Sequence, residues 1–283
     1  MADILFTPCV EREIDSMEPI ITRFPLDILK SGNFTKVPMM VGNNDKEGIY
    51  SVARDFGTSV KEVDTADLTK NDLVFPSEAD KNRTAQEIRQ FYFSSGEEEL
   101  VMNMVDLYSD LHFKFPMYVE TNLFSQAMEE PIFYYFFKYS GYMNLAKFSS
   151  NNAGVVGASH GDEVFYTHRS YILPYPERWL ENVMRKRMLT MWTNFAKYSD
   201  PTPVTSELLP VKWLSSRDSN PSALVIDNLF SIATLWDESA MRFWNDIYNK
   251  YRRRNYGFSN IKDCIHKIAD CNDTSNINLL DPE

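Results

Sequence analysis

The 283-residue sequence is short of basic residues, of cysteine and of long apolar runs. Its 29 lysines and arginines against 40 aspartates and glutamates give a formal net charge of −11. A negative field of this size repels nucleic-acid phosphates and anionic lipid surfaces, so nucleic acid is not expected as a partner. No segment approaches the roughly 20 apolar residues that cross a bilayer, and we therefore expect no membrane span.

The three cysteines are too few for a disulfide scaffold, and their spacing matches no zinc site, so no metal site is predicted. Cys264 and Cys271 lie close together in a polar stretch and could close a small disulfide loop in an oxidising compartment. Cys9 stands in an apolar segment and is interpreted as a buried thiol. No motif in the sequence indicates a cofactor.

The sequence says little about the cellular compartment. Asn-x-Thr sequons at Asn33, Asn82 and Asn272 permit N-glycosylation, but an asparagine-rich chain contains about that many by chance. Met1 is not followed by the basic and then apolar segments of a signal peptide. Secreted and cytoplasmic locations both stay open.

The residues that are present have the composition of a globular protein with a large core. Hydrophobic residues make up 43%, charged residues 24% and aromatic residues 14% of the chain. The length allows one large domain or two small ones. Because the chain turns polar from Ser259, we predict one domain over 1–258 and a polar C-terminal tail over 259–283.

Strands alternate with helices along the chain. Short apolar runs bounded by turn residues predict strands over 37–42, 132–139 and 223–227, and residues 1–50 otherwise read as extended pieces around a polar connector. Helical patterns cover 84–93, 97–111, 118–128 (after the breaker Pro116), Pro176 to just before Asp200, and Asp237 to Arg252. This alternation indicates an α/β layer architecture, in which functional loops follow the carboxyl ends of the strands.

Two such loops carry residues that suit acid–base chemistry. Glu47 follows the first predicted strand and His160 follows the second, within the loops 43–48 and 151–163. Taken singly, Glu47 would be a solvated acid and His160 a structural loop residue. Together they have the order of acid and histidine found in α/β-hydrolase triads, where the nucleophile precedes both.

Several segments, in order, resemble the type-B carboxylesterase and cholinesterase family. Within that family they resemble insect carboxylesterases, juvenile-hormone-esterase-like enzymes among them. The segments are 6–11, 31–48, 131–136, 157–163, 191–201, 224–227 and 242–245, so the resemblance runs from about residue 4 to about residue 252. It implies an α/β-hydrolase fold and hydrolysis of a small apolar ester by a serine esterase.

Carried over residue by residue, the resemblance makes Glu47 the triad acid and His160 the general base. The histidine would take the proton of a serine hydroxyl and return it to the leaving alcohol, while the carboxylate orients the imidazole. Gly48 and Gly161 would allow tight turns beside these residues. Asp162, like its neighbour Glu163, matches an acidic position that is interpreted as structural.

The family's Gly-rich oxyanion loop and Gly-Glu-Ser-Ala-Gly nucleophile elbow have no counterpart here, because this sequence begins after both. The resemblance therefore implies the C-terminal half of an α/β-hydrolase, with an incomplete central sheet and flanking helices. A missing N-terminal half of the same domain becomes the expected partner. The chain alone is expected to be inactive, and the first predicted strand, or a neighbour of it, is expected to lie at an open edge of the sheet.

Ser159 forms a literal Gly-x-Ser-x-Gly with Gly157 and Gly161. A nucleophile elbow needs a strand directly before the serine and a helix directly after it. The residues before Ser159 have a loop-like composition, so we expect an irregular loop and assign no nucleophile in this chain.

Two other classes of protein share the resemblance. A cholinesterase-like adhesion or interaction protein keeps the fold but lacks a working triad, and a free-standing half-domain could be a regulatory pseudoenzyme. The presence of both Glu47 and His160 favours the esterase over the adhesion protein. An in-frame Gly-x-Ser-x-Gly encoded upstream of Met1 would support the esterase.

Overall fold

The computed structural model describes residues 10–11, 17–56, 68–69, 72–94, 100–150, 154–168, 179–215, 222–234 and 238–253, and the fold and contacts are those of these residues. Several sequence predictions lie outside the described residues: Cys9, Cys264, Cys271, Asn272, the tail 259–283 and the helix start near Pro176. Of the other two sequons, Asn33 is exposed just after a helix, and Asn82 is exposed within one.

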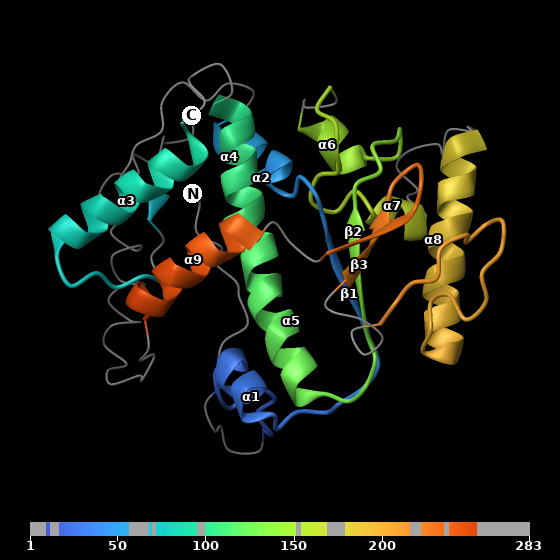
Figure 1. Ribbon diagram of the computed structural model, residues 1–283, viewed down its shortest axis with the longest axis horizontal. Coiled ribbons are helices and arrows are strands. Elements are labelled where there is room, and N and C mark those ends of the chain that lie inside the picture. The colour runs from blue at the N-terminus through green and yellow to red at the C-terminus, as the bar shows by residue number, and fades with distance from the viewer. Residues whose placement is uncertain are drawn as a thin grey trace, which may run out of the picture.

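A four-stranded sheet forms the centre of the molecule (Figure 1). Its order is β1-β2-β3-β4, with β1 at Met39–Asn44, β2 at Ile132–Phe137, β3 at Ser222–Ile226 and β4 at Ser231–Thr234. The first three strands run parallel, and β4 is antiparallel to β3. Three strands thus confirm the α/β prediction, whereas β4 was not predicted because its short, mostly exposed segment carries no buried apolar run.

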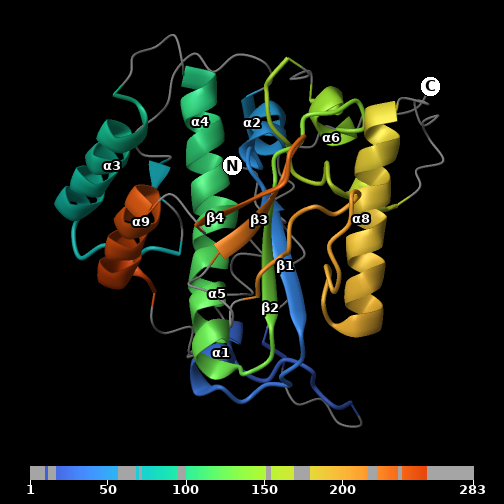
Figure 2. The ribbon, with the colours of Figure 1, turned by 45° about the vertical axis from the view of Figure 1, so that its right-hand side comes forward.

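Helices cover both faces of the sheet (Figures 1 and 2). In both views a column of helices stands on one side of the strands and α8 stands on the other. The bounds of the helices, in chain order, are α1 Pro25–Ser31, α2 Gly48–Phe56, α3 Glu78–Tyr92, α4 Leu100–Ser109, the π-helical turn η3 Asp110–Lys114, α5 Phe115–Ala127, α6 Leu145–Ser149, α7 Val164–Thr167, α8 Trp179–Tyr198 and α9 Glu238–Tyr251. None of the described helices has the length and apolar character needed to span a membrane.

The side chains of β2 alternate between two hydrophobic clusters, as the pleat of a strand requires. Phe133 and Phe137 belong to the cluster that contains the α8 methionines Met184, Met188 and Met191. The side chains that point to the opposite face, Ile132 and Tyr134, belong to a cluster on the α5 side. Because both faces are buried, the apolar run of β2 is continuous rather than alternating with polar residues.

Two predictions about helices were wrong. Helix α1 lies within residues 1–50, which we interpreted as extended pieces around a polar connector with no helix. Pro25 in its first turn and Gly32 at a left-handed φ of 66° just past its end are nevertheless ordinary helix boundary signals. Pro116 does not break the column of α4, η3 and α5 but lies in the first turn of α5. The π-helical turn ends just before it, and proline has no N–H that would need a partner there.

Candidate active site

The carboxyl ends of the parallel strands bring Glu47 and His160 together. Glu47 lies three residues beyond the end of β1, and His160 lies in the loop that precedes α7. The Oε2 atom of Glu47 is 2.8 Å from Nδ1 of His160, although the two residues are 113 positions apart in the sequence. The predicted approach of these two side chains is confirmed.

The two partners differ sharply in exposure. The Glu47 side chain is 5% exposed, whereas that of His160 is 54% exposed. The hydrogen bond to Glu47 raises the pKa of His160 above its usual value, and partial burial opposes this rise. With the Nδ1 proton donated to the carboxylate, the imidazole has its lone pair on Nε2, which is the arrangement of a general base.

Asn44 links the acid to the histidine loop, and sequence reasoning missed it. Its backbone N–H donates to Oε1 of Glu47 at 2.7 Å. Its fully buried side-chain amide donates to the Ser159 carbonyl at 2.7 Å and to the Glu163 carboxylate at 2.5 Å. A polar amide directly after a buried apolar strand was the only signal in the sequence that could have revealed it.

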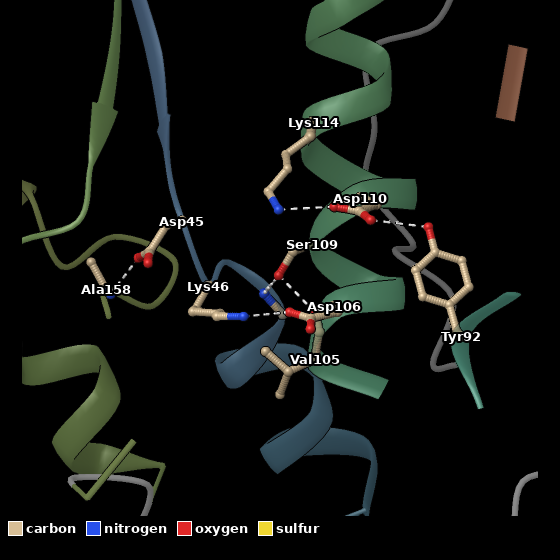
Figure 3. Close-up of polar contacts among 10 residues, drawn as sticks. Asp45, Lys46, Tyr92, Val105, Asp106, Ser109, Asp110, Lys114 and Ala158 are labelled. Carbon is tan, nitrogen blue, oxygen red and sulfur yellow. Dashed lines mark hydrogen bonds and ion pairs between the residues drawn. The ribbon is translucent and has the colours of Figure 1, made fainter. Parts of the chain in front are cut away.

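Backbone contacts also join the two loops. The Lys46 N–H donates to the Ala158 carbonyl at 3.0 Å, and the Ala158 N–H donates to the Asp45 carboxylate at 2.8 Å, as Figure 3 shows for Asp45. Burial raises the pKa of Asp45 despite this hydrogen bond. Gly157 has a left-handed φ of +115°, and a Cβ there would lie 2.8 Å from the Lys46 side chain, so a glycine is required.

Helix α4 holds the loop of Glu47 from the other side (Figure 3). Lys46 forms a 2.6 Å ion pair with Asp106, and the Gly48 N–H donates to Oγ of Ser109 at 2.9 Å. A Cβ on Gly48 would lie 2.3 Å from the Val105 carbonyl oxygen. Gly48 opens helix α2, so close packing against α4 explains this glycine better than the tight turn that we predicted.

Asp162 and Lys147 hold the histidine loop through its backbone. Asp162 accepts the Ser159 and Lys147 N–H groups at 2.7 and 3.2 Å, and burial raises its pKa to about 6. Lys147 is 2% exposed, and its ammonium donates to the Val155 and Gly157 carbonyls at 2.9 and 2.8 Å. These contacts are to the backbone, which supports a structural interpretation of Asp162. Lys147 was not predicted.

Ser159 lies in an irregular segment with no strand directly before it, as expected, and α7 begins only at Val164. Its side chain is fully buried, and within the described part of the chain Oγ has no hydrogen-bond partner. Gly161, two residues later, has a φ of +81°, so the predicted tight turn is confirmed there. Ser159 has neither the exposure nor the strand-to-helix setting of a nucleophile.

Two aromatic rings flank His160. The Phe113 ring lies 4.9 Å from the imidazole, centroid to centroid, and the Tyr50 ring lies 6.4 Å away. Phe113 comes from the π-helical turn η3 and Tyr50 from helix α2. No group of three or more potential metal ligands (His, Cys, Asp or Glu) that could hold a metal ion occurs within the described ranges.

A mostly parallel sheet between helices, with an acid and a histidine on the loops after its strands, is the arrangement of an α/β-hydrolase. The crystal structure of juvenile hormone esterase from Manduca sexta, with OTFP covalently attached, shares this fold. It matches with a TM-score of 0.68 and 22% sequence identity over 86% of this chain and 47% of the esterase. The model of the carboxylesterase family matches residues 2–244, so the chain belongs to that family.

Curated relatives are insect esterases. Juvenile hormone esterase from Tribolium castaneum is 25% identical over 79% of this chain and 40% of its own length. Venom carboxylesterase-6 from Apis mellifera is 25% identical over 68% of this chain and 36% of its own length. The chain therefore spans less than half the length of these relatives, and the family resemblance seen in the sequence is confirmed.

Proposed function

We propose that this chain is the C-terminal portion of a serine carboxylic ester hydrolase, with Glu47 as the triad acid and His160 as the general base. The observation that carries the proposal is the 2.8 Å contact between Glu47 Oε2 and His160 Nδ1 in a member of the carboxylesterase family. The substrate class is a small apolar ester.

In the proposed reaction, His160 Nε2 accepts the proton of a serine hydroxyl as its oxygen attacks the ester carbonyl. The tetrahedral intermediate collapses, the imidazolium gives the proton to the leaving alcohol, and an acyl-enzyme forms. A water molecule, deprotonated by His160, then attacks the acyl-enzyme carbonyl. The serine oxygen leaves, takes the proton back from the imidazolium, and the carboxylic acid is released. Glu47 orients the imidazole and stabilises the imidazolium through the Nδ1 hydrogen bond.

The serine and the oxyanion donors would come from an N-terminal half that this sequence does not contain. The coverage of the relatives, 36–47% of their lengths, supports this division. So does the position of β1, which pairs with β2 and forms one edge of the sheet among the described strands. A parallel strand with a partner on one side only leaves a row of amides and carbonyls for a further strand.

The test compares residues 1–283 alone with a joined protein, in which the N-terminal half of an insect carboxylesterase precedes the chain. Both are assayed with a short-chain aryl ester. We expect no turnover by the chain alone and turnover by the joined protein. His160→Ala should lower kcat of the joined protein by at least about 10³-fold.

The matched control is His168→Ala, because His168 is exposed at the end of α7 and should leave turnover unchanged. Turnover by the chain alone that disappears in His160→Ala would overturn the division into two halves. A joined protein that folds but hydrolyses no ester would favour the interaction-protein alternative.

A further inference from the structure

The π-helical turn η3 interrupts an otherwise regular column of helices beside His160. Within it the Phe115 N–H donates to the Asp110 carbonyl, five residues back rather than four. Such turns are rare, are less favourable than regular α-helix, and recur at functional sites. The extra residue changes the direction of the side chains in the turn. The turn η3 can therefore orient a side chain in a way that a regular α-helix at the same position could not.

A buried polar chain holds this turn in place (Figure 3). The Asp110 carboxylate accepts the Lys114 ammonium at 2.9 Å, which spans the turn, and the Tyr92 hydroxyl at 3.0 Å. The indole N–H of Trp244 on α9 donates to the same Tyr92 hydroxyl at 2.8 Å. Asp110 is 7% exposed, so these contacts lie in a low-dielectric environment that favours one geometry.

The side chain that the turn presents to His160 is Phe113. Its ring centroid lies 4.9 Å from that of the imidazole, at an interplanar angle of 44°. The His160 side chain is 54% exposed, and its imidazole is held at Nδ1 by the hydrogen bond to Glu47. A half-exposed ring held at one end in this way can rotate away from its acceptor unless another group packs against it.

We propose that Phe113 is a positioning residue: the π-helical turn places its ring against the imidazole of His160 and keeps Nδ1 on Glu47. The catalytic consequence rests on the proposed function, whereas the positioning does not. When His160 takes up a proton, Nδ1 stays a donor to Glu47 and the Phe113 ring still lies against the imidazolium, so the same contact acts in both protonation states.

The first experiment follows the imidazole itself. Histidine-selective ¹⁵N labelling of the full chain, read by NMR, reports the tautomer and the pKa of His160. Phe113→Leu should convert a predominantly Nδ1-protonated ring to a mixture, and the pKa should fall toward its usual value because the Glu47 bond is broken more often. Phe113→Tyr keeps the ring and should behave as the wild type.

Phe91→Leu is the matched control, since it removes a ring that stacks on Phe243. Phe113→Met fills the space with an unbranched side chain and serves as a second variant if Phe113→Leu does not fold. In the joined protein, Phe113→Leu should lower kcat about tenfold with KM unchanged, and Phe113→Tyr should stay within about twofold of wild type.

Wild-type tautomer and pKa values in folded Phe113→Leu or Phe113→Met would overturn the proposal. A change in KM with those values intact would show instead that the ring contacts substrate. If the NMR changes occur while the joined protein hydrolyses no ester, the proposed function fails and the positioning role stands.

Discussion

At the scale of single residues, the candidate site combines a buried acid with a half-exposed base. Glu47 receives the Asn44 N–H on one oxygen and contacts His160 with the other, so both of its oxygens are occupied. This arrangement fixes the carboxylate and leaves the orientation of the imidazole to one hydrogen bond and its ring neighbours. We therefore expect the clearest effects from single substitutions that change the protonation of His160 or remove the amide of Asn44.

Glu47→Gln should move the acidic limb of the kcat/KM profile of the joined protein to lower pH. The base must be neutral to act, so the limb follows the pKa of His160, and the Glu47 hydrogen bond is the main cause that raises this pKa. The plateau should fall on the order of 10⁴-fold, because glutamine does not stabilise the imidazolium. An unchanged limb would contradict the assigned pairing.

The same pairing affects stability. Because the pKa of His160 is raised in the folded chain, its contribution to the free energy of unfolding is present below the unfolded pKa and is lost as pH rises through the folded pKa. In Glu47→Gln this pH-dependent contribution should be smaller. Urea unfolding at several pH values between about 5 and 8 measures it, with His168→Ala as the control.

Asn44→Leu should lower the free energy of unfolding by about 1–3 kcal/mol, because the Ser159 carbonyl and the Glu163 carboxylate each lose a buried donor. Asn44→Asp should be worse, and more so at pH 8 than at pH 5, since it places a further carboxylate beside Glu163. Asn33→Asp, on an exposed asparagine, should be nearly neutral. Urea unfolding curves that show equal stability for Asn44→Asp and Asn33→Asp would refute the role of this amide.

At the scale of elements, local apolar patterns were enough to predict three strands, whereas features that depend on distant contacts were missed. Strands β1, β2 and β3 are apolar runs, and each lies within two residues of its predicted start. Strand β4 pairs with the edge of β3, and Asp110 of η3 accepts a hydrogen bond from Tyr92, which is 18 residues earlier in the chain. Glu47 and His160 could be paired from their places after strands, whereas the Asn44 link requires the packed loops.

Gly48→Ala should destabilise the chain by about 1–3 kcal/mol, because the new Cβ would overlap the Val105 carbonyl and push α2 away from α4. The Ser109 hydrogen bond to Gly48 would lengthen at the same time. Gly154→Ala, which meets open space, is the matched control and should be close to neutral. Thermal unfolding followed by circular dichroism distinguishes the two; equal melting temperatures would contradict this account of the helix packing.

At the scale of the whole molecule, the sheet is asymmetric. Among the strands that the structure describes, one edge is the short antiparallel strand β4, and the other is β1, which is longer and parallel to its neighbour. The N–H groups of Met39 and Asp45 donate toward β2, so by the alternation of a strand those of Met40 and Gly42 face away from it. An edge of this kind can pair with another strand.

The chain alone should therefore associate in a concentration-dependent manner, measured by sedimentation velocity. Met40→Pro removes an outward N–H without removing a bond to β2 and should reduce the association. Met39→Pro removes the inward bond to the Pro131 carbonyl and should destabilise the fold instead. Association that is the same in Met40→Pro and wild type, with both folded, would exclude β1 as the pairing edge.

The hydrogen bond from Asn44 to Glu47 also limits where any added strand can reach. The Asn44 N–H is the next outward group after Gly42, and it is already taken by Oε1 of the acid. A strand laid along β1 can bond Met40 and Gly42 but finds no free donor at Asn44. The carboxylate that orients the imidazole thus marks the end of the pairing edge. A strand that took the Asn44 N–H would remove one of the two hydrogen bonds that hold Glu47.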